Sequence, residues 1–191
     1  MSEIFEIPSN TTAEPVNKFA IPIRYGLMVG FISMFLTTIT FLYILKLHFL
    51  AFTAAGFLMF AIPVVFYFIT AKQQQKAFGG YIALKDAFQA VFIVILISLT
   101  ISTIYGLIYV KYIDPSCMDR VKESIVAFFE SSKNVTQETI DAQIEKMDAQ
   151  ALDSTAPGKL LYSFAQSIII NSIFGFIAAL IVSRKKPVAQ F

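Results

Sequence analysis

Residues 25–70 read YGLMVGFISMFLTTITFLYILKLHFLAFTAAGFLMFAIPVVFYFIT and carry one formal charge, on Lys46. As a single helix this stretch would be about 70 Å long, at about 1.5 Å per residue. The hydrocarbon core of a bilayer is only about 30 Å thick. The chain must therefore turn back, and Lys46-Leu47-His48 is the polar interruption at which it can do so. The stretch predicts two membrane-spanning helices, 25–45 and 50–70, joined as a tight hairpin.

Two further apolar stretches, 87–110 and 160–182, are also long enough to cross a membrane. The composition agrees, since 15% of the residues are charged, against about 25% in a soluble domain. All eight tyrosines fall near a predicted span end and none at a predicted midplane, which is where an aromatic belt lies. The sequence predicts an all-α integral membrane four-helix bundle that forms one domain over 25–186.

Basic residues set the orientation, because loops rich in Lys and Arg stay in the cytoplasm. They fall before the first span, between the second and third, and after the fourth: Lys18, Arg24, Lys72, Lys76, Lys85, Arg184, Lys185 and Lys186. The segment 111–159, with nine acidic and six basic residues, lies on the opposite face. We therefore expect cytoplasmic polar tails at 1–24 and 187–191. Pro22 is expected to delay the first helix until Arg24.

The outer loop 111–159 is expected to form an amphipathic helical hairpin between the third and fourth spans. Ser116 and Asp119 resemble a capping box, and Asn134–Thr136 marks a second helix start. Apolar residues recur at helical spacing after each start and form the candidate interaction face: Met118, Val121, Ile125, Phe128, Phe129, Ile140, Ile144 and Met147. Their apolar faces could pack on each other, lie on the outer leaflet or meet a partner protein.

Small and polar residues recur within the spans and are candidates for helix packing or for lining a polar pathway. They are Gly26, Gly30, Ser98, Ser102, Gly106, Ser167, Asn171, Gly175 and Ala179. Packing within one bundle is the favoured interpretation, because such stripes let helix backbones approach closely; a homo-oligomer seam is the alternative. The Asn171 amide needs a hydrogen-bonding partner, for which Ser98, Ser102, Thr37 and Thr38 are the candidates.

Several chemistries are disfavoured by what the predicted spans lack. They contain no Asp, Glu, Lys, Arg or His, whereas proton-coupled carriers and voltage sensors need buried ionisable groups. One Cys and one His, Cys117 and His48, give no metal or cofactor site, and the net charge of +2 does not point to nucleic acid. We therefore expect no enzyme. An activity on a lipid-borne substrate, using Lys85, Asp86 or His48, is the less favoured alternative.

Two modifications stay open. Cys117 is expected on the outer side, as a free thiol by default or in a disulfide between chains. Asn134-Val135-Thr136 fits an N-glycosylation sequon.

Three motifs together resemble a known family: GGYIALKDAFQAVFIVILISL at 79–99, YIDP at 112–115 and SRKK at 183–186. The chain resembles, over about 22–186, a four-helix membrane-protein family of Bacteroidota known as the domain of unknown function DUF4199. The resemblance implies an inner membrane with 111–159 in the periplasm, and an O-glycosylation site at Ser154 or Thr155. It supplies no functional residues.

These observations lead to one functional hypothesis and one main alternative. The hypothesis is a non-enzymatic membrane component, an assembly, scaffold or interaction subunit that meets lipid and a protein partner through its outer loop. The alternative is a small oligomeric transporter or channel whose path is lined by the polar stripe of the fourth span. A partner or a second copy of the chain is possible in both cases.

Overall fold

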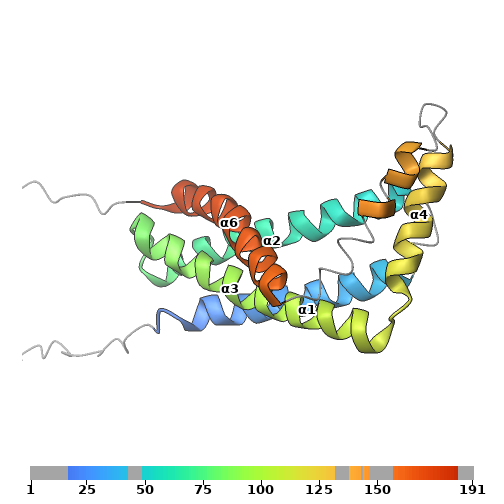
Figure 1. The fold of residues 1–191 in the computed structure, drawn as a ribbon. Helices are drawn as coiled ribbons and strands as arrows, with labels where there is room; N and C mark the ends of the chain where they lie inside the picture. The colour runs from blue at the N-terminus through green and yellow to red at the C-terminus, as the bar shows by residue number, and fades with distance from the viewer. Residues whose placement is uncertain (1–16, 43–48, 132–137, 143, 147–156, 185–191) are drawn as a thin grey trace, which may run out of the picture.

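The computed structural model describes residues 17–42, 49–131, 138–142, 144–146 and 157–184. Four of the described helices are long and apolar enough to cross a membrane, which confirms the all-α, four-span prediction. They are α1 (Ala20–Leu42), α2 (Phe49–Ala77), α3 (Leu84–Ile108) and α6 (Pro157–Val182). A shorter amphipathic helix, α4 (Cys117–Ser131), runs across one end of this bundle (Figure 1).

Helix α1 begins earlier than the sequence suggests. The expectation that Pro22 delays the helix until Arg24 is wrong, because α1 starts at Ala20 and Pro22 lies buried in its first turn. The first N–H groups of a helix have no partner within the helix, so a proline there removes no hydrogen bond. The first helix therefore includes residues 20–24, which the sequence places in the polar tail.

Helix α2 continues through polar residues to Ala77, seven residues beyond the predicted end of its span at 70. Gln74 is buried and donates from Nε2 to the carbonyl oxygen of Lys18 at 3.0 Å, while Gln75 donates from Nε2 to the carbonyl oxygen of Val182 at 3.0 Å. The two glutamines thus tie the last turns of α2 to the start of α1 and the end of α6.

The turn from α2 to α3 is built on Gly79 and Gly80, which have φ values of 75° and 91°. Residues with a side chain rarely adopt this left-handed conformation. The Gly79 and Gly80 N–H groups donate to the carbonyls of Lys76 and Gln75 and so end α2. Beyond the turn, Ile82 and Arg184 exchange two backbone hydrogen bonds of 3.2 and 3.0 Å. The start of α1, the α2–α3 turn and the end of α6 therefore meet at one end of the bundle, the basic end.

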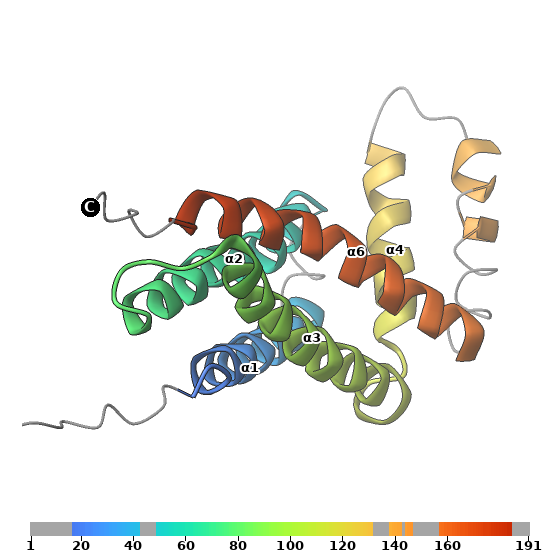
Figure 2. The ribbon, with the colours of Figure 1, turned by 90° about the vertical axis from the view of Figure 1, so that its left-hand side faces the viewer.

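Helix α3 lies at the centre of the bundle and packs against α1, α2 and α6 (Figure 2). The core contains small, branched and aromatic side chains from all four spans: Val29, Tyr67, Ala71, Val91, Val94, Ile95 and Ala178. On α6 the buried residues Gly175, Ala178 and Ala179 all lie in the C-terminal half, and no residue from 158 to 174 is buried. The N-terminal half of α6 is therefore packed less closely than the rest of the bundle.

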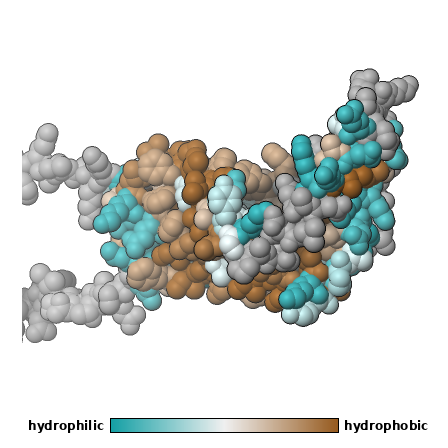
Figure 3. Space-filling model, in the orientation of Figure 1, coloured by the Kyte–Doolittle hydropathy of each residue, from teal (hydrophilic) through white to brown (hydrophobic). Residues whose placement is uncertain are grey.

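The outer surface of the spans is apolar. Phe31, Phe35 and Phe57 are among many large hydrophobic side chains that are exposed, at 62%, 67% and 71%. Figure 3 shows this surface as a hydrophobic belt with hydrophilic residues at its two ends. Such a belt is stable only when lipid covers it, so the chain is a multi-pass membrane protein.

Candidate functional site

Asn171 lies near the middle of α6 and bonds to a neighbouring span, and its predicted partners are wrong. Its Oδ1 accepts a hydrogen bond of 2.8 Å from the hydroxyl of Tyr67 on α2, and its Nδ2 donates to the Ser167 carbonyl at 2.9 Å. Ser98 instead bonds to its own helix, at the Ile95 carbonyl. Asn171 therefore joins α6 to α2 near the middle of both helices.

Tyr67 also corrects the idea that every tyrosine lies in an interfacial belt. Its side chain is 1% exposed within the bundle, as is that of Tyr109, which stacks on Phe41 at 5.2 Å between ring centroids. A buried tyrosine needs a partner for its hydroxyl, and Tyr67 finds one in Asn171. Proximity to a predicted span end could not distinguish such a packing tyrosine from a belt tyrosine.

The predicted glycines fall into two groups. A Cβ on Gly26 would lie 2.9 Å from Ile97 Cβ, one on Gly30 would lie 2.7 Å from Ile101 Cδ1, and one on Gly175 would lie 2.9 Å from atoms of α3. These three glycines are in close helix contacts within one chain. A Cβ on Gly106 would have no such neighbour within 4 Å, so Gly106 is not in a close contact.

The remaining stripe residues differ in burial. Ala179 is fully buried and Ser98 is 4% exposed, whereas Ser102 and Ser167 are half-buried. The Ser167 hydroxyl donates to the Ser163 carbonyl of its own helix. The outer half of the α6 stripe thus faces away from the core, together with the exposed Ser163 and Gln166.

At the other end of α3, a five-residue π-helical turn, η2 (Tyr109–Ile113), leads into α4. The Asp114 carboxylate pairs with the guanidinium of Arg120 and also accepts a hydrogen bond of 2.9 Å from the Ser116 hydroxyl, while Arg120 donates to Ser116. We call these three residues the outer clamp. The Ser116 hydroxyl thus bonds to Asp114 and Arg120, and not to Asp119 as the predicted capping box requires. The hydrogen bonds from Arg120 and then Ser116 lower the pKa of Asp114.

Cys117 lies beside the outer clamp as a free thiol and is buried, with 0% exposure. Burial, reinforced by the nearby Asp114 charge, raises the pKa of the Cys117 thiol. A protonated, enclosed thiol is a poor nucleophile. The Tyr109 hydroxyl and Arg120 Nε are also buried here without a partner among the described residues.

The predicted interaction face of the outer loop is partly covered. Met118, Val121, Ile125, Phe129 and Ile144 are half-buried and Ile140 is 3% exposed; the Phe128 side chain and Met147 lie outside the described residues. The opposite side of α4 is exposed and acidic, with Asp119, Glu123 and Glu130. Because 132–137, 143 and 147–156 lie outside the described residues, the helical hairpin, Asn134, Ser154 and Thr155 stay predictions, as does the placement of His48.

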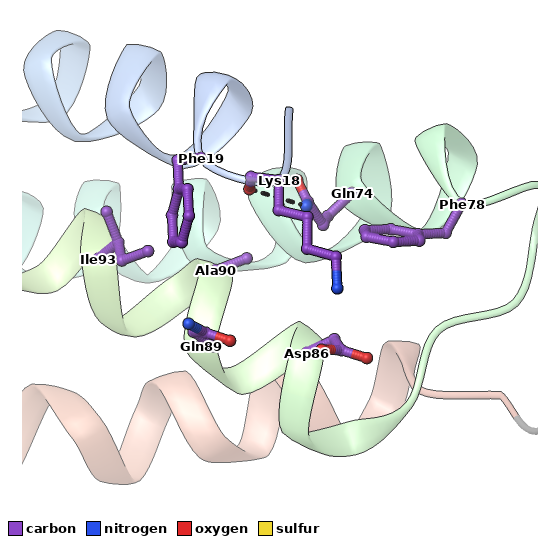
Figure 4. Close-up of a pocket in the computed structure, with 8 residues that line it drawn as sticks. All are labelled: Lys18, Phe19, Gln74, Phe78, Asp86, Gln89, Ala90 and Ile93. Carbon is purple, nitrogen blue, oxygen red and sulfur yellow. Dashed lines mark hydrogen bonds between the residues drawn. The ribbon is translucent and has the colours of Figure 1, made fainter. Parts of the chain in front are cut away.

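A shallow, partly open hollow lies at the basic end, where α1, α2 and α3 meet (Figure 4). Its polar lining comes from Lys18, Gln74, Asp86 and Gln89, and its apolar lining includes Phe19 and Phe78. The Lys18 Nζ lies 5.6 Å from the centroid of the Phe78 ring. The sequence singles out Asp86 only for an activity on a lipid-borne substrate, and its position near Lys18 and Gln74 could not be predicted because both are distant from it in the chain. Among the described residues, no group of three or more His, Cys, Asp or Glu could hold a metal ion.

Comparison with known proteins gives one match. A family described as a protein of unknown function (DUF4199) matches residues 24–184, which confirms the resemblance noted in the sequence. No curated protein and no solved structure matches the chain.

Proposed function

Because the chain belongs to the DUF4199 family, whose function is unknown, we propose a role from its own geometry. The protein is a non-enzymatic component of a bacterial inner membrane that engages a partner protein through its outer segment, 111–159. Its termini lie in the cytoplasm and this segment lies in the periplasm. The orientation is supported by the meeting of Lys18, Lys76 and Arg184 near one end of the bundle, since basic residues favour the cytoplasmic side.

One observation carries the proposal: α4 is a fifteen-residue amphipathic helix held across the opposite end of the bundle. The outer clamp and the buried Cys117 fix its N-terminus to the end of α3. Its acidic side, at Asp119, Glu123 and Glu130, stays exposed. A helix held in this way presents a surface beyond the membrane without having to be ordered on binding, which lowers the entropic cost of association.

Photocrosslinking in intact cells tests this proposal. A photoreactive amino acid is placed at Glu123 on the exposed side of α4, at Ile125 on its apolar side, and at Ile169 on α6 as the control. Ile169 is 64% exposed on the apolar belt and is expected to face lipid. We expect a discrete protein adduct from Glu123 and none from Ile169. Adducts with lipid alone at both α4 positions would refute the interaction role.

A second candidate, a small oligomeric transporter or channel, is favoured by the outer half of α6. Ser163 and Gln166 are exposed there at the level of the spans, where lipid cannot satisfy their polar groups. A second copy of the chain or a water-filled path would satisfy them. A photoreactive residue at Gln166 that yields an adduct of twice the chain mass would support this candidate. Asn171→Leu separates the roles further: a path residue loses flux in a folded protein, whereas a packing residue loses stability.

A further inference from the structure

We propose that the hollow at the basic end binds the headgroup of a zwitterionic phospholipid that carries a primary ammonium, a phosphoethanolamine lipid. The inference is independent of the role of the outer segment. It starts from two opposite charges that lie across the hollow and do not meet. Lys18 reaches from the start of α1 and Asp86 stands in the first turn of α3 (Figure 4). Among the described residues, no ion pair joins Lys18 to Asp86.

A buried acceptor without a partner gives the hollow its chemical preference. Gln74 is 2% exposed and uses Nε2 to hold the Lys18 carbonyl at 3.0 Å, but its Oε1 has no hydrogen-bond partner among the described residues. An unsatisfied buried acceptor is costly, so a donor that reaches it is strongly favoured. A primary ammonium has three N–H donors and can bond Oε1 of Gln74 and the Asp86 carboxylate together.

The same geometry disfavours the other common headgroups. A choline headgroup has no N–H donor and would leave Oε1 unsatisfied. A glycerol headgroup has no ammonium of its own, so even with its phosphate paired to Lys18 the Asp86 carboxylate would be left without a cation. The phosphate of phosphoethanolamine, in contrast, can pair with Lys18, whose amine lies over the Phe78 ring between that ring and Asp86.

The surroundings of the hollow indicate a lipid and not a soluble molecule. Phe19, at the edge of the hollow, lies directly before α1 and begins a stripe that continues on α1 through Ile23 and Leu27. These three side chains are 48%, 44% and 42% exposed, so they are accessible to an acyl chain. The hollow lies at the basic end, where the apolar spans end and a headgroup is found.

The test uses the full chain in mild detergent and three lipids with identical acyl chains and ethanolamine, choline or glycerol headgroups. Native mass spectrometry measures the bound fraction of each lipid over a concentration series. We expect the ethanolamine lipid to bind about tenfold more tightly than the other two, as expected for a charge-assisted hydrogen bond. Equal binding of the three lipids would overturn the proposal, because it is the result expected if Gln74 Oε1 is satisfied by water.

Two variants locate the site. Asp86→Asn keeps the size of a half-buried side chain and should abolish the preference over the glycerol lipid, which depends on the Asp86 charge, whereas Asp119→Asn on α4 is the matched control and should preserve it. Lys18→Gln should weaken the binding of the ethanolamine lipid, because it removes the contact with the phosphate. A preference over the glycerol lipid that survives Asp86→Asn would overturn the assignment. Soluble phosphoethanolamine, added at the lipid's concentration, should not displace the lipid, and displacement would overturn the lipid as the ligand.

Discussion

Replacing Gly26 by alanine tests whether α1 and α3 are as close as the structure shows. The new Cβ would lie 2.9 Å from the Cβ of Ile97. Ile97 Cβ is bonded to the backbone and cannot rotate away, so the two helices must separate. Overpacking of this kind costs about 1–3 kcal/mol. The exchange of glycine for alanine within a helix recovers about 1 kcal/mol, so we expect a net loss of up to about 2 kcal/mol.

Gly106→Ala is the matched control, because Gly106 is also helical and has nothing within 4 Å of the new Cβ. It should gain the helix propensity, about 1 kcal/mol, without the clash. Since the propensity gain is common to both variants, their difference isolates the contact at about 1–3 kcal/mol.

Thermal unfolding of the purified protein in detergent measures this difference. For a chain of this size about 1 kcal/mol shifts the midpoint by about 2–4 °C, so Gly26→Ala should melt several degrees below Gly106→Ala. Equal midpoints would refute the reasoning, because they would mean that the Cβ added at Gly26 meets no more resistance than the one added at Gly106.

Three further predictions concern hydrogen bonds and the outer clamp. Tyr67→Phe leaves Asn171 Oδ1 without its partner and should destabilise the protein by about 1 kcal/mol, measured by thermal unfolding, whereas Tyr162→Phe, at a side chain 71% exposed, should have no effect. Cys117 should react slowly with a maleimide at neutral pH because it is buried, and Arg120→Ala should speed the reaction by loosening the clamp; an unchanged rate would contradict the clamp. The pKa of Asp114 is lowered on folding by Arg120 and Ser116, so its contribution to stability is complete above its ordinary value of about 3.8 and is lost as the pH falls through the lower folded value. The difference in melting midpoint between the native chain and Asp114→Asn should therefore be constant from about pH 5 to 8 and shrink in more acidic buffer.

The four membrane-spanning helices could be predicted from the sequence because a span is defined by its composition. A helix in hydrocarbon must satisfy its own backbone and present apolar side chains all round, so 25–70 indicates its two crossings without knowledge of any neighbour. The ends were less predictable. Pro22 and the glutamines after Lys72 are found more often outside apolar helices, yet Pro22 is harmless in a first turn and Gln74 and Gln75 bond the ends of neighbouring helices.

Pairwise contacts of the candidate sites could not be read from spacing. The partner of Asn171 depends on how α2 and α6 are rotated about their axes, and the sequence offers Tyr67 no mark that separates it from an interfacial tyrosine. The burial of Cys117 depends on where α4 docks, which Asp114 and Arg120 decide across a six-residue separation. One local feature of the sequence could have indicated this pair: Asp114 lies shortly before a predicted helix and Arg120 lies in its first turns.

The two ends of the bundle are held in different ways, and this difference bears on both proposals. At the basic end, the hydrogen bonds between elements all involve the backbone. The side chains of Gln74 and Gln75 donate to backbone carbonyls of other elements, and Ile82 and Arg184 bond backbone to backbone. Such bonds fix helix ends whatever side chains neighbouring residues carry, so a hollow formed there keeps its shape for a headgroup. At the outer end, α4 is fixed by side chains of the clamp, and the nearby half of α6 has no buried residue among those described. Elements held by few buried contacts open at low energetic cost, so this half of α6 can adjust when a partner binds, while the clamp keeps α4 in place.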